Sequence, residues 1–147
     1  RRRVVRLPDD IYVIEDRVTG ICREDHDIRL YYNFAFGHLD GENGKFVYTS
    51  QKGRGYTMTV QADKKLDFEI LEGSENPIGG WISYGYAWRK PIPQLIAKHS
   101  GKAPIHFITV LAPEGTKAET AINGDAAMVT LAGGKVLTLT ENAVELH

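Results

Sequence analysis

The amino-acid sequence predicts an all-β fold, a two-sheet antiparallel β-sandwich of about ten to twelve short strands. Three observations support this prediction. Almost every apolar pattern repeats every second residue, turn-forming residues interrupt the patterns at short intervals, and no stretch longer than a turn or two has helical periodicity. No linker or fixed-period repeat divides the chain, so residues 1–147 are expected to form one domain.

The period of two is clearest in residues 26–36, where apolar side chains alternate with polar ones, as a half-buried strand requires. Other short β-rich runs are expected to be strands and comprise residues 45–49, 56–61, 66–70, 104–111, 126–131 and 135–140. Ala132-Gly133-Gly134, between the last two runs, predicts a tight hairpin. Residues 93–99 have a brief helical pattern, but the prolines at their beginning favour an extended entry.

Composition excludes several classes of partner. The hydrophobic fraction is 42% and the charged fraction 25%, as in an ordinary globular domain. The net charge of -1 provides no electrostatic footprint for nucleic acid, and no apolar run approaches the ~18 residues that cross a membrane. Arg1-Arg2-Arg3 is expected to be a solvated strand end or a cut point. The start without methionine suggests a segment of a longer polypeptide.

No metal or other cofactor is expected. Cys22 is the single cysteine, which excludes an internal disulfide and a cysteine-rich metal site. His26 is the one candidate metal ligand, because Asp25 and Asp27 beside it are also zinc ligand types. No second ligand group accompanies it, so His26 is more simply the start of a surface strand. His106 is expected to be a strand histidine whose hydrogen bonds are satisfied.

No catalytic residue is assigned from the sequence. It contains no G-x-S-x-G, no P-loop and no G-x-G-x-x-G after a strand. The carboxylates of Glu15-Asp16, Glu24-Asp25 and Asp67/Glu69 look like those of strand ends and polar strand faces. Their number alone leaves a glycosidase pair open.

The densest cluster of binding chemistry lies in residues 73–93, the one long stretch without clear alternation. Aromatic faces stack on the apolar face of a pyranose ring, and Arg or Lys pairs with carboxylate or sulfate. The candidate carbohydrate-binding residues are Tyr84, Tyr86, Trp88, Arg89 and Lys90. The alternative is core packing, with Trp81 and Tyr86 pointing inward. Strand alternation would place Trp81, Ser83, Gly85 and Ala87 on one face, and Ile82, Tyr84, Tyr86 and Trp88 on the other.

The same stretch resembles a G-W-x-S-x-x-Y-G-x-(K/R)-x-P-x-P pattern near the C-terminus of heparinase II/III-like polysaccharide lyases. The matching residues are Gly80, Trp81, Ser83, Tyr86, Arg89, Pro91 and Pro93. A strand comes next in that family, and its counterparts are Gly101, Pro104, Phe107, Thr109, Leu111 and Pro113. The front of the chain is similar too, through Val13–Gly20, His26 and the aromatic strand to Phe36, so the likeness runs from about Arg3 to Val110. Departures that weaken inferences about substrate are Ala87 for a glycine, Lys90 for an acid and His106 for an arginine.

The resemblance implies a lyase that cleaves uronic-acid polysaccharides by β-elimination, in which a base removes the C5 proton and the leaving oxygen is protonated. In the family, the catalytic Tyr and Asn and one His lie on an N-terminal helical toroid, with another His early in the β region. This chain has no toroid and is expected to begin after that second His, so no catalytic role is carried onto its residues.

The resemblance therefore predicts a C-terminal β-sandwich domain that is inactive alone and supports or completes the substrate cleft of its parent. The expected partners are the helical toroid and an anionic polysaccharide, and the expected location is periplasmic or secreted. Two alternatives remain open: an independent, non-catalytic carbohydrate-binding module, and a small all-β enzyme such as a glycosidase.

Overall fold

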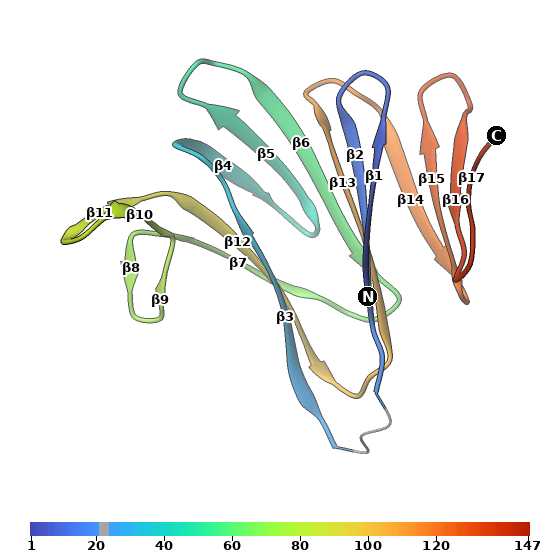
Figure 1. Cartoon of the computed structure of the whole chain (residues 1–147), viewed down its shortest axis with the longest axis horizontal. Helices are drawn as coiled ribbons and strands as arrows, with labels where there is room; N and C mark the ends of the chain where they lie inside the picture. Colours follow the sequence, from blue (N-terminus) through green and yellow to red (C-terminus); the bar gives the residue numbers. More distant parts are fainter. Residues whose placement is uncertain (21–23) are drawn as a thin grey trace.

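The computed structural model describes residues 1–20 and 24–147 and contains seventeen strands (Figure 1). Cys22 lies outside the described residues. No helix occurs in the described part of the chain, and so none there is long and apolar enough to cross a membrane. The all-β prediction is confirmed, although the strands outnumber the ten to twelve that the sequence predicts because several are very short.

The widest sheet is antiparallel and has six strands in the order β1-β2-β13-β6-β5-β4. Its strands are β1 (Arg2–Leu7), β2 (Ile11–Val18), β4 (Gly37–Glu42), β5 (Lys45–Ser50), β6 (Gly55–Ala62) and β13 (Ile105–Pro113). Short turns connect β1 to β2, β4 to β5 and β5 to β6, whereas β13 comes from much later in the chain and pairs with both β2 and β6. The centre of this sheet therefore depends on long-range pairing.

Two smaller antiparallel sheets accompany it. The three-stranded sheet has the order β3-β12-β7, with β3 (His26–Asn33), β7 (Asp67–Glu72) and β12 (Pro93–Gly101). The four-stranded sheet runs β14 (Ala118–Asn123), β15 (Ala126–Leu131), β16 (Val136–Leu139) and β17 (Val144–Leu146). The predicted hairpin at Ala132-Gly133-Gly134 joins β15 to β16, and residues 93–99 are extended in β12, as expected.

The six-stranded sheet lies between the other two, so the sandwich has three layers where the sequence predicts two (Figure 1). Strand β13 explains why, since alternate residues of a strand point to opposite faces and both of its faces are buried. Ile108 and Val110 pack in the core shared with the four-stranded sheet. On the opposite face, the Thr109 hydroxyl lies 2.7 Å from the hydroxyl of Tyr32 in β3.

Each interface has its own hydrophobic core. The core beneath the four-stranded sheet consists of Leu7, Ile11, Val13, Ile108, Val110, Ala112, Ala127, Val129, Leu137 and Leu139. The core beneath the three-stranded sheet consists of Leu39, Phe46, Tyr48, Met58, Val60, Leu95 and Ala97. Burial of apolar area at about 25 cal/mol per Å² is the main force that holds the layers together.

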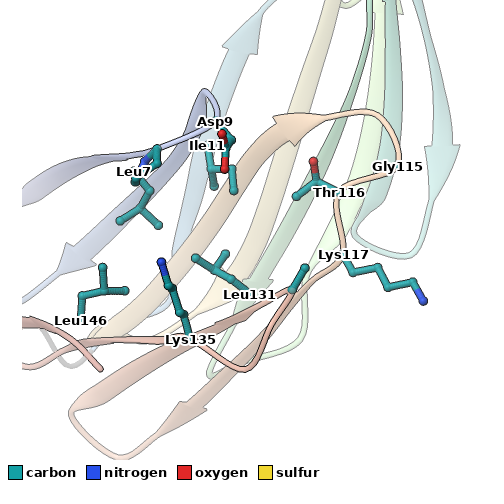
Figure 2. Close-up of a pocket in the computed structure, with 11 residues that line it drawn as sticks. Leu7, Asp9, Ile11, Gly115, Thr116, Lys117, Leu131, Lys135 and Leu146 are labelled. Carbon is teal, nitrogen blue, oxygen red and sulfur yellow. The ribbon is translucent and has the colours of Figure 1, made fainter.

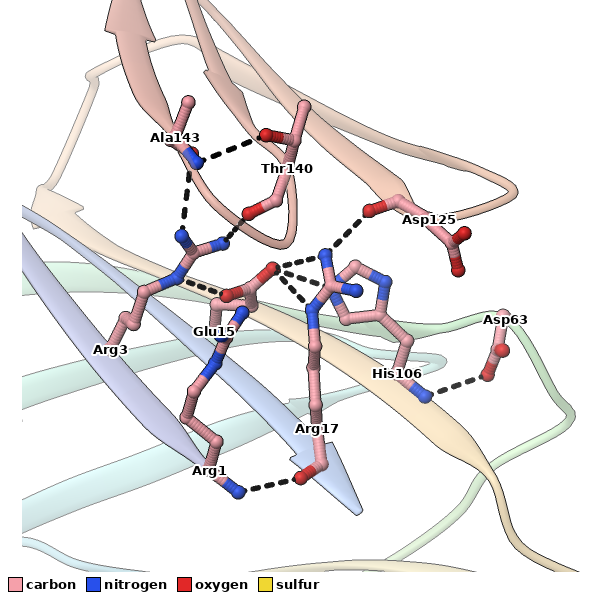
Figure 3. A network of polar contacts seen from close by, with 9 residues as sticks. All are labelled: Arg1, Arg3, Glu15, Arg17, Asp63, His106, Asp125, Thr140 and Ala143. Carbon is pink, nitrogen blue, oxygen red and sulfur yellow. Dashed lines mark hydrogen bonds and ion pairs between the residues drawn. The ribbon is translucent and has the colours of Figure 1, made fainter. Parts of the chain in front are cut away.

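A buried polar network closes one end of the interface with the four-stranded sheet (Figure 3). The Glu15 carboxylate accepts hydrogen bonds from Arg3 Nε at 2.5 Å and Arg17 Nε at 3.0 Å, and it lies 2.9 Å from His106 Nε2. The Arg3 guanidinium also donates to the carbonyls of Thr140 and Ala143, and the Arg17 guanidinium donates to the carbonyl of Asp125. One carboxylate thus holds two arginines that bind the loops of the opposing sheet.

This network corrects two predictions. Glu15 and Asp16 are not strand-end carboxylates, because they are 0% and 7% exposed. The run Arg1-Arg2-Arg3 is a solvated strand end only in part, since Arg1 and Arg2 are exposed whereas the Arg3 side chain is 19% exposed and pairs with Glu15. A signal for Glu15 was present in the sequence: it follows Ile11 and Val13 at the same inward phase of the period-two pattern.

Replacement of the buried carboxylate is expected to loosen the four-stranded sheet. Glu15→Gln leaves Arg3 and Arg17 without their counter-charge, so the free energy of unfolding should fall by about 3 kcal/mol. Urea unfolding measures it. The control is Asp10→Asn, which removes the exposed Arg6–Asp10 pair and should cost less than about 1 kcal/mol. Equal losses in the two variants would contradict the structural role given to Glu15.

Acid is expected to act on the same network. Burial raises the pKa of Glu15, but hydrogen bonds and charge from Arg3 and Arg17 outweigh it, so the pKa lies below its usual value of 4.5. A carboxyl with a depressed folded-state pKa stabilises the fold above its unfolded pKa and loses that contribution as pH falls through the folded one. Unfolding measured over a series of acidic pH values should show this loss in the unmodified chain and a smaller one in Glu15→Gln.

Candidate functional site

Two hairpins project near the start of β12 and form the candidate site (Figure 1). They are β8 (Ser74–Glu75) with β9 (Ile78–Gly79), and β10 (Trp81–Gly85) with β11 (Trp88–Pro91). The sequence does not predict the individual strands of this stretch, because each strand is too short to display a period of two. The structure places all five predicted carbohydrate-binding residues in the second hairpin or its turn.

Contacts between the hairpins fix their relative position. Trp81 Nε1 donates to the Ser74 carbonyl at 2.9 Å, and Arg89 Nη2 pairs with Glu75 Oε1 at 2.6 Å. The Arg89 guanidinium also lies over the Trp81 ring, 4.2 Å from its centroid, in a cation–π arrangement. Gly80 allows the close approach at their base, since a Cβ there would lie 2.6 Å from the Leu71 carbonyl oxygen.

The face of the second hairpin opposite Trp81 carries an exposed aromatic pair and a cation. The rings of Tyr84 and Trp88 are 5.3 Å apart and tilted by 33°. Lys90 Nζ lies 5.6 Å from the centroid of the Trp88 ring. Tyr84 is 74% exposed and Trp88 37% exposed. Among the described residues no ion pair includes Lys90, so its charge is available to a ligand in a way that the Glu75-bound charge of Arg89 is not.

The alternative that Tyr86 points inward and packs in the core is wrong. This residue lies in the turn between β10 and β11 and is fully exposed, at 102%. Strand alternation cannot be continued through a turn, which is why the predicted face for Tyr86 fails while those for Tyr84 and Trp88 hold. Trp81 is partly buried between the hairpins instead of in either main core.

The turn of the second hairpin holds a non-glycine residue at positive φ. Ala87 has a φ of 56°, the left-handed region that glycine adopts without steric cost. Ser83 stabilises the turn with its hydroxyl, which donates toward the carbonyls of Gly85 at 2.9 Å and Trp88 at 2.7 Å. The structure therefore tolerates Ala87 with local backbone strain.

A shallow groove runs along the Trp81 side of the hairpins. It has a volume of about 330 Å³ and is lined by Ile78, Gly79, Gly80, Trp81, Ile82, Ser83, Arg89 and Gln94. The groove combines an aromatic ring, a guanidinium and the side-chain amide of Gln94. These are groups that can contact the ring faces, hydroxyls and anionic substituents of a sugar.

A second cavity, of about 450 Å³, lies at the open end between the six-stranded and four-stranded sheets (Figure 2). Its lining is mostly apolar, with Leu7, Ile11, Leu131 and Leu146, and its polar members are Asp9, Thr116, Lys117 and Lys135. Aliphatic walls offer few partners to sugar hydroxyls, and a polar group buried without hydrogen bonds is costly. This cavity is therefore the poorer match for the predicted ligand.

The two histidines singled out from the sequence lie in different strands, His26 in β3 and His106 in β13. His26 begins β3 opposite Gly101 in β12, and within the described ranges no group of three or more His, Cys, Asp or Glu side chains is placed to hold a metal. His106 is buried as expected of a strand histidine, but only half satisfied. Its Nε2 contacts Glu15, whereas its Nδ1 has no hydrogen-bond partner among the described residues.

No family model matches the sequence, and no curated protein matches it. The fold matches a segment of a heparinase III structure with methylated lysines, at a TM-score of 0.67 and 16% identity over 88% of this chain and 21% of that one. It also matches a heparan sulfate lyase HepC mutant from Pedobacter heparinus, at a TM-score of 0.65 and 14% identity over 93% of this chain and 23% of that one.

These matches confirm the likeness to heparinase-type lyases at the level of the fold. This chain spans about a fifth of the length of each matched protein. The matched proteins therefore contain further parts beyond the region that resembles this one.

Strain at the hairpin turn provides a test of its geometry. Ala87→Gly should keep or slightly stabilise the hairpin, whereas Ala87→Val should weaken it by about 1–2 kcal/mol because a β-branched residue resists positive φ. Both tryptophans of the chain lie in this hairpin, so near-ultraviolet circular dichroism and tryptophan fluorescence during thermal unfolding report on it directly. A valine variant with unchanged signals would contradict the turn conformation.

Proposed function

We propose that this chain is a non-catalytic β-sandwich domain of a heparinase II/III-like polysaccharide lyase, and that it presents the β10–β11 hairpin to an anionic polysaccharide. The observation that carries the proposal is the exposed face of Tyr84, Trp88 and Lys90 on a projecting hairpin of a chain with this fold. The alternative is an independent carbohydrate-binding module that uses the same face.

The chemistry of the hairpin suits an anionic sugar. Tyr84 and Trp88 present tilted aromatic surface, which stacks on pyranose C–H groups with little loss of side-chain entropy. Lys90 beside them provides a point charge for a carboxylate or sulfate. Arg89 has a positioning role in this proposal, because its charge and its planar face already hold Glu75 and Trp81.

The roles proposed for the two parts of the parent lyase rest on the family resemblance. The helical toroid supplies the base and acid of β-elimination, and this domain borders the cleft and retains the polymer. Uronic-acid polysaccharides are the proposed substrate class, and a periplasmic or secreted location is proposed with it. A projecting hairpin on a rigid sandwich fits such a role, since binding groups on loops are most effective when a scaffold positions them.

The sugar contact is tested by isothermal titration of the chain with heparan sulfate, alginate and chondroitin. Trp88→Ala and Tyr84→Ala should each weaken binding by about tenfold, in keeping with roughly 1–1.5 kcal/mol for an aromatic contact. Lys90→Ala should weaken binding less, and its effect should shrink as salt is raised because the charge is screened.

Matched controls are Lys135→Ala, an exposed cation in the turn between β15 and β16, and Val4→Ala, an exposed apolar residue of β1. Neither should change affinity. Binding that survives both aromatic substitutions unchanged would show that the hairpin cluster is structural.

The proposal that this domain is non-catalytic predicts a second result, on β-elimination by the isolated chain. Incubation of this chain with the same polysaccharides should produce no ultraviolet absorbance from an unsaturated product of β-elimination. A sustained rise would overturn the non-catalytic assignment and make Tyr84, Tyr86 and His26 the first residues to replace.

A further inference from the structure

The cavity between the six-stranded and four-stranded sheets lies far from the β10–β11 hairpin (Figures 1 and 2). Its volume of about 450 Å³ falls in the range of roughly 300–1,000 Å³ that is usual for small-molecule sites. The residues around it come from the β1–β2 turn, the connection from β13 to β14, the β15–β16 hairpin and the end of β17. Four separate segments of the chain thus form its walls.

The walls continue the hydrophobic core outward. Leu7 and Ile11 are 7% and 6% exposed and belong to that core, and Leu131 packs against it. Leu146 completes the apolar wall although it is 49% exposed. No aromatic residue of the described chain lines the cavity, so its apolar surface is aliphatic and contains no stacking platform. An apolar ligand in the cavity would remove the exposed part of Leu146 from water, which favours binding.

Three charged side chains line the cavity, and none of them takes part in an ion pair among the described residues. They are Asp9, Lys117 and Lys135. In Figure 2 the Lys135 ammonium points toward Leu7, whereas the Lys117 side chain points away from the cavity. Asp9 lies beside Ile11, on the side of the β1–β2 turn, and disfavours an anion there. The cavity therefore has one place for an anion, next to Lys135, and aliphatic surface for the rest of a ligand.

These features suit an amphiphile with one alkyl chain and one anionic group. Each methylene moved from water into an apolar site strengthens binding about fourfold. A lysine ammonium is a compact point charge, which matches a single carboxylate. A sugar is a poorer match because its hydroxyls would lack partners against the leucines. A cationic amphiphile is poorer too, because its charge would approach Lys135.

We propose that this cavity binds a free fatty acid, with its carboxylate at Lys135 and its alkyl chain against Leu7, Ile11, Leu131 and Leu146. The site is separate from the proposed polysaccharide surface, and its ligand belongs to a different chemical class. Binding covers the exposed part of Leu146 and gives Lys135 a counter-charge.

Isothermal titration of the full chain tests the ligand class with decanoate, dodecanoate and dodecyltrimethylammonium, each below its critical micelle concentration. One dodecanoate should bind per chain, about tenfold more tightly than decanoate because it has two more methylenes. Dodecyltrimethylammonium should bind about fivefold more weakly than dodecanoate, because its cationic head group gains no ion pair with Lys135.

Two variants test the residues of the cavity. Lys135→Gln should weaken dodecanoate binding about two- to fivefold, by a factor that shrinks as salt is raised. Leu146→Ser should weaken it about three- to tenfold, because part of the alkyl chain loses its apolar contact. The matched controls are Lys52→Gln, an exposed lysine of another turn, and Val144→Ser, in the same strand as Leu146 and 44% exposed but outside the lining. Neither control should change dodecanoate affinity.

Four results would overturn the proposal. Several dodecanoate molecules per chain, or equal affinity for the anionic and cationic amphiphiles, would indicate adventitious binding only. Unchanged dodecanoate affinity in Lys135→Gln and Leu146→Ser, with the native fold checked by circular dichroism, would place the ligand elsewhere. No binding by the unmodified chain would fit a cavity filled by a segment of the parent.

Tryptophan fluorescence and competition separate this site from the hairpin. Both tryptophans lie in the β10–β11 hairpin, so a dodecanoate brominated at its chain end should leave their fluorescence unchanged. Quenching would place the alkyl chain at the hairpin and contradict the cavity site. Saturating dodecanoate should also leave a titration with heparan sulfate unchanged. Failure of the polysaccharide proposal therefore leaves this one standing, and the reverse holds too.

Discussion

The buried carboxylate of Glu15 joins two of the three layers of this protein. It is surrounded by Arg3, Arg17 and His106, and the two arginines reach across to backbone carbonyls of the four-stranded sheet. Charge-assisted hydrogen bonds in a buried setting are directional, unlike the apolar contacts of the neighbouring core. The network therefore sets how the four-stranded sheet sits on the six-stranded one, and the apolar core provides most of the free energy of packing.

Strands β12 and β13, which come late in the chain, connect two of the layers. β13 lies at the middle of the six-stranded sheet and is buried on both faces, while β12 lies at the middle of the three-stranded sheet. Because they are consecutive in the chain and belong to different layers, they connect those layers covalently close to the core.

In the proposed function, stability and recognition use different parts of the molecule. In the hairpins, Arg89 contacts both Trp81 and Glu75, and these contacts fix the position of the hairpins. The opposite face of the second hairpin presents Tyr84, Trp88 and Lys90. A binding surface that is already ordered loses less entropy when a ligand arrives. The fold of this chain matches about a fifth of each of two heparinase-type lyases.

The sequence by itself determined the strand content, the β15–β16 hairpin and the cluster of aromatic and cationic residues, because these depend on local periodicity and turn chemistry. Only the tertiary structure decided that there are three layers, since a period of two indicates a strand but not its partners. It also decided the roles of Arg3 and Glu15, which look like surface charges until distant strands surround them. In the hairpin, sequence spacing could not separate Arg89 from Lys90. Glu75 is fourteen residues from Arg89, and their pairing exists only in the folded chain. Of the two cations, Lys90 is the one that no described ion pair includes.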